Sequence, residues 1–235
     1  MSNVTRLDNV AHADLTIAPG HGPVFGDAVN QIALFLPEFE EAQRHYPILF
    51  RRQDNGVLQA LAILGFDRDE NLFLDGERWA ADYVPALARR GPFRIGLEGG
   101  EPMIHVDLDH PRILGEGVDG GEPLFLPQGG QAPALDRAVE ALRAIHVGHE
   151  AAPAMTALFD ELGLARPVTL NVQVTESQSY NFKDYLAIAP DGIAALDGAA
   201  LERLNQAGFL LPAVFAASSL ANMHRLSARK RATIG

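Results

Sequence analysis

Two arginines, Arg89 and Arg90, stand directly before a Gly91–Pro92 turn and the aromatic Phe93. A guanidinium group presents its N–H donors in a planar fork that matches a carboxylate, so paired arginines can hold an anionic group. Arg44, in the stretch "RHYP", is a third cation beside an aromatic residue and a rigid turn. The sequence therefore predicts recognition of a small anionic ligand, or of a protein or peptide partner.

The residues that could complete such a site are spread along the first half of the chain. Binding pockets combine apolar walls with a few polar groups. The candidate ligand- or partner-binding residues are Arg44, His45, Tyr46, Trp79, Tyr83, Arg89, Arg90, Phe93, Asp107, Asp109 and Arg112. A structural role is the alternative: Arg89 and Arg90 would end a helix and balance an acidic sheet face, while Tyr46 would anchor a helix end.

The stretch "HVDLDHP", residues 105–111, could support a different chemistry. Alternate side chains of a strand share a face, so His105 and Asp107 would point to the same side. A His-x-Asp pair with a further histidine, His110 or His45, is the type of ligand set that non-haem iron oxygenases use. An iron-dependent enzyme with His105, Asp107 and His110 is therefore an alternative. The polar face of a half-exposed strand has the same pattern, so we expect no metal, cofactor or catalytic residue.

The composition excludes several classes of site. The chain has 235 residues, a formal net charge of −11 and no cysteine, which excludes disulfides, thiolate metal sites and cysteine nucleophiles. Nucleic-acid binding requires a basic surface, so no nucleic-acid partner is expected. The one basic cluster, expected to be a solvated helix end favoured by the helix dipole, is Arg225, Arg229, Lys230 and Arg231.

The apolar segments bear on the expected cellular location of the protein. Residues 1–26 lack the apolar run of a secretory signal. The most apolar stretch, residues 207–223, is shorter than the roughly 20 apolar residues needed to span a bilayer. A cytoplasmic protein without a membrane-spanning helix is expected. The same stretch predicts a buried or interface helix, and a homodimer could bury Phe209, Val214 and Phe215 there.

Hairpins position the candidate residues of the first half. Asn55–Gly56 is a strong hairpin signal between the apolar segments 47–50 and 58–66. A second hairpin is expected around Gly99–Gly100, with the acidic residues on its second strand. The alternating segment 168–175 predicts another strand, paired with the segment that follows its polar loop.

Helices are expected to dominate the second half. An apolar stripe predicts a helix from residue 133 to about 163, which Gly148 and Pro153 would break or bend. Further helices are expected over 198–207 and 212–229.

The expected fold is α+β, with a β-rich N-terminal half containing hairpins and a helical C-terminal half ending in a long helix. Residues 1–28 are expected to form a flexible N-terminal arm. Residues 29–235 would form a single domain, β-rich over 29–130 and helical with one β-hairpin over 131–235.

Four stretches taken together resemble the SapC family of bacterial proteins: "FEEAQRHYPILF", "ALAILGFDRDENLFLDGERWAADYVPALARRGPF", "VDLDHPRI" and "GEPLF". The resemblance runs from about residue 32 to about residue 228, so the domain is expected to be SapC-like. The family pattern has a tyrosine where this chain has Gly91. His105 is not part of that pattern, whereas Asp107, Asp109 and Arg112 are closer to it.

The resemblance implies an accessory or binding protein of bacterial nutrient uptake or modification systems, without catalysis of its own. Genes of this family often lie near TonB-dependent receptors, flavin-dependent halogenase-like proteins and cupin-like oxygenases, which implies such partners. The family name derives from surface-layer systems, so a surface-layer-associated structural protein is a further alternative. The label "peptide transporter permease", also used for the family, does not suit a chain in which no spanning helix is expected.

Overall fold

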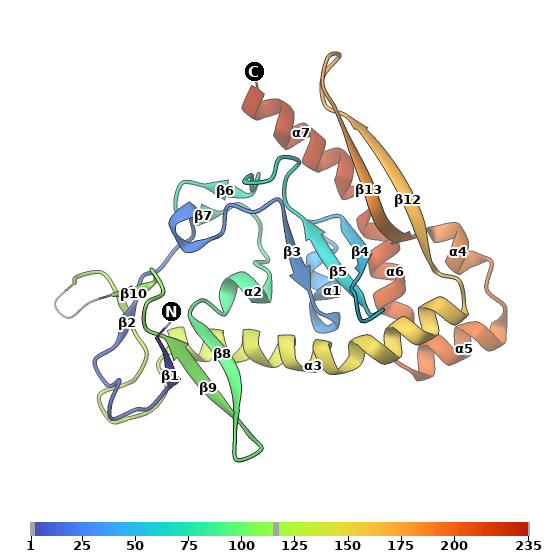
Figure 1. The fold of residues 1–235 in the computed structure, drawn as a ribbon. Coiled ribbons are helices and arrows are strands. Elements are labelled where there is room, and N and C mark those ends of the chain that lie inside the picture. Colours follow the sequence, from blue (N-terminus) through green and yellow to red (C-terminus); the bar gives the residue numbers. More distant parts are fainter. Residues whose placement is uncertain (1–2, 115–117, 235) are drawn as a thin grey trace.

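The largest sheet has five strands and carries the main hydrophobic core (Figure 1). The computed structural model describes residues 3–114 and 118–234. Neighbouring strands of this sheet are antiparallel, in the order β12-β13-β4-β5-β3. The strands are β3 (Gln31–Leu34), β4 (Ile48–Arg52), β5 (Leu58–Ile63), β12 (Ala165–Gln173) and β13 (Ser179–Ile188).

Two hairpins follow from local turn signals. Gly56 has φ +84°, a left-handed conformation that glycine adopts without strain, and it turns β4 into β5. Gly99 and Gly100 also have positive φ and join β8 (Phe93–Glu98) to β9 (Glu101–Asp107). Both predicted hairpins are therefore confirmed, as is the pairing of β12 with β13.

Small sheets lie on the side of α2 away from the five-stranded sheet (Figure 1). β1 pairs with β9, and β2 lies between β10 and β11. Residues 3–28, part of the segment expected to be an arm, thus add strands to sheets built from later parts of the chain. The short strands are β1 (Val4–Arg6), β2 (Thr16–Ile17), β6 (Leu74–Asp75), β7 (Arg78–Trp79), β10 (Ile113–Leu114) and β11 (Glu122–Pro123).

One long helix, α3 (Pro133–Glu161), connects the two sides of the molecule (Figure 1). Of the break or bend expected at Gly148 and Pro153, the break is wrong, because the helix continues through both residues. Met155 and Phe159 are buried just beyond the proline, and this packing outweighs the one hydrogen bond that Pro153 cannot donate. The other helices are η1 (Pro23–Phe25), η2 (Leu36–Glu38), α1 (Phe39–Ala42), α2 (Ala86–Arg89), α4 (Pro190–Ala194), α5 (Gly198–Gln206), α6 (Leu210–Ser219) and α7 (Asn222–Ile234).

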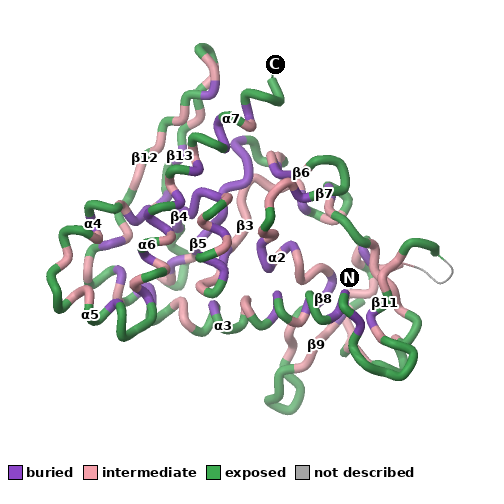
Figure 2. Tube along the Cα trace, turned by 180° about the vertical axis from the view of Figure 1, so that it is seen from behind, coloured by how far each residue is buried: buried purple, intermediate pink, exposed green. Residues whose placement is uncertain are grey.

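Two hydrophobic cores lie along α3. The larger contains the buried residues of the five-stranded sheet together with Met155 and Phe159 of α3. The smaller contains Leu135 and Leu142 of α3 and Phe93 of β8. Figure 2 colours these buried stretches purple, over the sheet and along the helix. The short helix α2 and its following turn therefore lie where the two cores meet.

The C-terminal part is helical, as expected, apart from a turn at residues 220–221 between α6 and α7. Its basic cluster is not solvated throughout: Lys230 is 7% exposed and its ammonium group contacts Asp67 at 2.6 Å and Glu70 at 2.5 Å. The expectation of a solvated helix end is wrong for Lys230. The loop carboxylates attract this lysine into the fold and tie α7 to the turn after β5.

In the described part of the chain, no one helix has the length and apolar character to cross a membrane. The pair formed by α5 and residues 210–234 meets these criteria together, although the two parts are bent by 101°.

Candidate functional site

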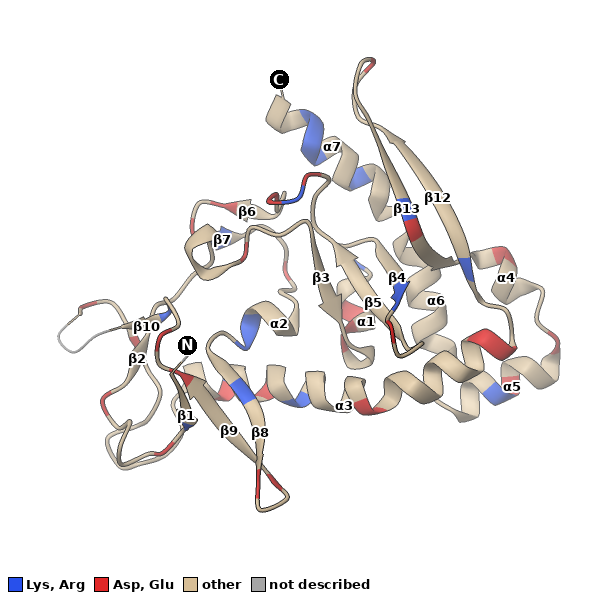
Figure 3. Ribbon diagram, viewed as in Figure 1, with Lys and Arg blue, Asp and Glu red and all other residues tan. Residues whose placement is uncertain are grey.

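A cleft of about 270 Å³ lies between the two cores, beside α2. We call it the arginine pocket, because four arginines contribute to its wall. Figure 3 shows the cations at the end of α2 in blue, close to α3. The pocket is lined by Ile17, Ala18, Pro19, Gly20, His21, Val84, Ala88, Arg89, Arg90, Gly91, Pro92, Phe93, Arg112, Glu122, Ala134 and Arg137.

A second cleft, of about 200 Å³, shares part of this wall. Ala88, Arg90, Gly91 and Arg112 line both spaces. The other side of the second cleft includes the apolar residues Phe25, Val29, Ile32, Trp79 and Leu87. Arg90 and Arg112 are thus the cationic groups of a wall with a cleft on each side.

The backbone around α2 sets the direction of the two arginines. Pro85 occupies the N-cap with extended geometry, and the amide of Ala86 donates to the Glu38 carboxylate at 2.7 Å. Gly91 has φ +53°, and a Cβ there would lie 3.4 Å from Cδ of Arg112. The positive φ, which glycine adopts without strain, ends the helix and accounts locally for Gly91 in this chain.

The guanidinium groups of Arg89 and Arg90 have few partners. Nη2 of Arg89 donates to the Tyr83 hydroxyl at 3.2 Å, and Nη1 of Arg90 donates to the carbonyl of Phe93 at 2.8 Å. Their Nε atoms are both buried and lack a hydrogen-bond partner in the described residues. Burial lowers the pKa of Arg90, and the nearby Arg94 cation lowers it further. The described residues place no carboxylate within ion-pair distance of either arginine.

Arg112, by contrast, has a counter-charge. Its Nη2 contacts Asp27 at 3.0 Å, and its Nη1 donates to the carbonyl of Gly20 at 2.6 Å. Both residues of this pair are 6% exposed. Asp27 also contacts His21 at 3.2 Å. The pair holds the N-terminal segment against the turn after β9 and supports the wall of the pocket.

A buried carboxylate, Glu38, lies under the Arg89 side of the site. Its Oε1 accepts from the Tyr83 hydroxyl at 2.9 Å, and its Oε2 accepts from the Phe35 amide at 2.8 Å. Burial raises the pKa of Glu38, although these hydrogen bonds and the Arg89 charge act against the shift. The chain Glu38, Tyr83, Arg89 thus orders one guanidinium through a hydroxyl instead of a direct ion pair.

Replacement of Glu38 by glutamine is expected to cost about 1–2 kcal/mol near neutral pH, because the new amide group faces the Phe35 N–H. The raised pKa means that the native state holds this proton more tightly than the unfolded chain. Wild-type stability from this group is full below the ordinary value of 4.5 and is lost as pH rises through the folded pKa. Urea unfolding should therefore show a larger deficit for Glu38→Gln near pH 4.5 than at neutral pH.

The matched control is Glu40→Gln, since the Glu40 side chain is 64% exposed. It should cost much less than Glu38→Gln at both pH values. A Glu38→Gln deficit that grew as pH rose would contradict the sign of the shift.

Four aromatic candidates form the support of the site. Tyr46 is fully buried, its hydroxyl donates to the carbonyl of Tyr83, and it accepts from the Trp79 indole at 2.7 Å. These contacts fit the alternative role of Tyr46 as an anchor of the helix end. Trp79 lines the second cleft and Phe93 lines the arginine pocket. Tyr83 lies behind Arg89, whose guanidinium carbon is 5.2 Å from the centre of the Tyr83 ring.

Other predicted residues are not brought to the pocket. Arg44 is exposed and pairs with Glu41 at 3.0 Å, and neither it nor His45 lines either cleft. Asp107 accepts from the amide of Asp109 at 3.2 Å, and Asp109 accepts from the amide of Asn3 at 3.0 Å. These two carboxylates order the end of β9 and the start of the chain. Neither Asp107 nor Asp109 lines the arginine pocket or the second cleft.

The two histidines considered as iron ligands, His105 and His110, make different contacts. His105 Nε2 contacts Glu98 at 3.2 Å across the β8–β9 hairpin, and its ring covers Gly96. His110 accepts from the amide of Arg112 at 3.1 Å and lines the second cleft. Over residues 3–114 and 118–234, no three His, Asp or Glu side chains are grouped so that they could hold a metal ion.

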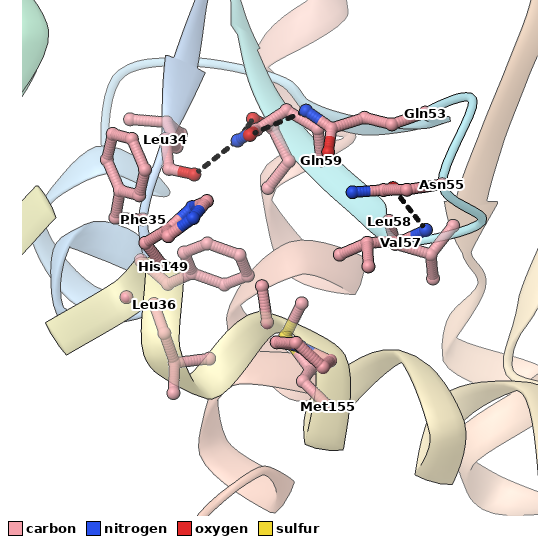
Figure 4. A pocket seen from close by; sticks show the side chains of 15 residues that line it. Leu34, Phe35, Leu36, Gln53, Asn55, Val57, Leu58, Gln59, His149 and Met155 are labelled. Carbon is pink, nitrogen blue, oxygen red and sulfur yellow. Dashed lines mark hydrogen bonds between the residues drawn. The ribbon is translucent and has the colours of Figure 1, made fainter. Parts of the chain in front are cut away.

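A further small cavity, of about 100 Å³, lies between α3, β5 and η2 (Figure 4). Its walls include Leu34, Phe35 and Met155 together with the polar side chains of Gln59 and His149. The Gln59 amide donates to the carbonyl of Leu34 at 3.0 Å, so this group already has an internal partner. The cavity is less than half the size of the arginine pocket.

Several important polar residues have no signal in the sequence. Asp27 and Glu38 are single acidic residues in a chain with 30 of them, and only tertiary contacts distinguish them. Arg137 lies on the polar face of α3 and pairs with Glu122 at the rim of the pocket. A lone carboxylate beside Gly26 or Pro37 is an ordinary turn residue in sequence terms.

Comparison with known proteins gives one match. The family model described as SapC matches residues 7–226. No curated protein and no solved structure matches the chain. The role of the arginine pocket must therefore be argued from its own geometry.

Proposed function

The chain belongs to the SapC family, and we propose that it serves there as a binding protein that recognises an anionic group through Arg89 and Arg90. One observation carries the proposal: two neighbouring arginines line the same cleft, and the buried Nε atom of each lacks an acceptor in the described residues. Natural proteins satisfy nearly all buried polar atoms. An anion bound at this wall would supply an acceptor to each arginine that turns its Nε–H toward the cleft.

The energetics favour such a ligand. A buried donor without a partner costs about 1–3 kcal/mol, and more when the group is charged. A carboxylate or phosphate oxygen would regain this free energy and would also offset the charge of Arg90, which has no counter-ion in the described part of the chain. The free energy lost by leaving these donors without acceptors is recovered as binding free energy when the anion binds.

The same groups support binding more than catalysis. A guanidinium remains protonated throughout the physiological range, so it positions an anion without exchanging protons. We place the protein in the cytoplasm as an accessory component of nutrient uptake or modification. Its partners would be components such as TonB-dependent receptors and halogenase-like or cupin-like proteins, as the resemblance to the family implies.

Anion-dependent stabilisation tests the proposal. Replacement of Arg89 and Arg90 by methionine keeps much of the apolar stem of each side chain and removes the charge. Phenylacetate and inorganic phosphate are each added to both proteins, and thermal unfolding is followed. The wild type should gain stability with at least one anion, and the double variant should bind that anion about 10- to 100-fold more weakly, as expected for hydrogen bonds to a charged group.

Arg203→Met is the matched control, because Arg203 is exposed and paired with Glu161 away from the pocket. Salts also stabilise proteins without specific binding, so the difference between variants carries the result. Equal stabilisation of wild type, control and a folded double variant by both anions would refute the site.

A further inference from the structure

We infer that the ligand of the arginine pocket carries a single carboxylate on an apolar body. This inference rests on the proposed anion binding at Arg89 and Arg90 and names the class of ligand. Three observations lead to it: the charge balance of the pocket, the free edge of the Arg90 guanidinium, and the apolar side chains beside it.

The charge balance leaves room for about one negative charge. Arg112 pairs with Asp27 and Arg137 pairs with Glu122. Arg89 donates to the Tyr83 hydroxyl, which donates in turn to the buried Glu38, so an acidic group lies close behind Arg89. Among the arginines of the described lining, Arg90 has no carboxylate partner and no hydroxyl that links it to a carboxylate. A dianionic phosphate would bring more charge than this lining balances.

The geometry of Arg90 suits a planar carboxylate. Its Nη1 is engaged by the carbonyl of Phe93, whereas its Nε has no acceptor among the described residues. Nε–H and Nη2–H form the side edge of a guanidinium, and two parallel N–H donors match the two oxygens of a carboxylate. Arg89 lines the same pocket, and its buried Nε also lacks an acceptor among the described residues.

Apolar side chains make up much of the remaining wall. Phe93 is fully buried, and the aliphatic residues come from three stretches of the chain, 17–19, 84–92 and 134. The volume of about 270 Å³ lies near the lower end for small-molecule sites, so the ligand is a small acid. The apolar lining residues include Ile17, Val84, Ala88, Pro92, Phe93 and Ala134.

Calorimetric titration of the whole chain with four probes tests this class of ligand. Phenylacetate has the carboxylate and an apolar ring, acetate lacks the ring, benzyl alcohol lacks the charge, and inorganic phosphate is compact and more highly charged. The inference predicts that phenylacetate binds about tenfold or more tightly than each of the other three, from burial of the ring and pairing of the charge. Arg90→Met should weaken phenylacetate binding about 10- to 100-fold.

The outcomes separate this inference from the proposal on which it rests. Phosphate binding that exceeds phenylacetate binding and depends on Arg90 would overturn the carboxylate class and leave anion recognition intact. Benzyl alcohol bound as tightly as phenylacetate would overturn the role of the charge. Absence of binding by all four probes, or phenylacetate binding unchanged in a folded Arg90→Met variant, would overturn both. The wild-type probe series gives a result even if the variant does not fold.

Discussion

Replacement of Asp27 by alanine is expected to destabilise the protein by about 3–5 kcal/mol, because it leaves the buried guanidinium of Arg112 without its counter-charge. The two residues are each 6% exposed, and their side chains meet at 3.0 Å. Asp27 also accepts from the amide of Gly22 at 3.0 Å and contacts His21 at 3.2 Å. Urea unfolding of the wild type and the variant measures this loss.

The effect of Asp27 should depend on pH in a defined direction. Burial acts to raise the pKa of Asp27, but hydrogen bonds from His21 and Gly22 and the charge of Arg112 hold it below the ordinary value of 3.8. The unfolded chain therefore binds this proton more readily than the native state. The stability from Asp27 is present above pH 3.8 and is lost as pH falls through the lower native pKa.

Asp75→Ala is the matched control for this pair. Asp75 contacts Arg78 at 3.4 Å, but both side chains are more than two-thirds exposed. Exposed ion pairs contribute about 0–1 kcal/mol, so the control should remain close to the wild type. A similar small loss for Asp27→Ala would mean that the buried pair does not support the wall of the arginine pocket.

Replacement of Gly148 by alanine is expected to cost about 3 kcal/mol, against the usual benefit of alanine in a helix. A Cβ at this position would overlap Cβ of Phe35 and lie 3.0 Å from the backbone nitrogen of Leu36. Neither group can rotate away, so α3 and η2 would have to separate. The urea midpoint should fall and the small cavity beside His149 should change shape.

Gly192→Ala is the comparison for this variant, because Gly192 also lies within a helix and has no neighbouring atom within 4 Å of an added Cβ. It should be neutral or stabilising by about 0.5–1 kcal/mol. Equal effects at the two positions would show that close packing does not set the requirement for glycine at position 148.

Local signals predicted much of the fold. Asn55–Gly56 and Gly99–Gly100 specify their hairpins within a few residues, because positive φ at glycine fixes each turn. The continuity of α3 could not be predicted in the same way. Gly148 and Pro153 are unfavourable in a helix, and only packing against β5 and η2, from distant parts of the chain, reverses that preference.

The candidate site also has features that local sequence predicts and features that only tertiary contacts determine. Arg89, Arg90 and Phe93 are adjacent in sequence, so their joint presence at a turn was predictable. The partners that decide which cations remain free, Asp27 and Glu38, lie about 50 or more residues from the arginines they influence. The burial of Lys230 could not be predicted from its neighbours in sequence either, because its partners Asp67 and Glu70 lie in a loop of the N-terminal half.

The central claim concerns the Nε–H groups of Arg89 and Arg90, which lack acceptors in the described residues. The most direct measurement is a nitrogen–proton correlation spectrum of the arginine side chains during titration with phenylacetate, with the two signals assigned from the methionine variants. The account predicts that the Arg90 Nε–H signal shifts strongly and saturates, that Arg89 responds with it, and that the exposed, paired Arg203 does not. Anion recognition at this site would be contradicted if the Arg89 and Arg90 signals stayed unchanged while the signal of another arginine saturated. It would also be contradicted if no arginine signal responded to phenylacetate or phosphate.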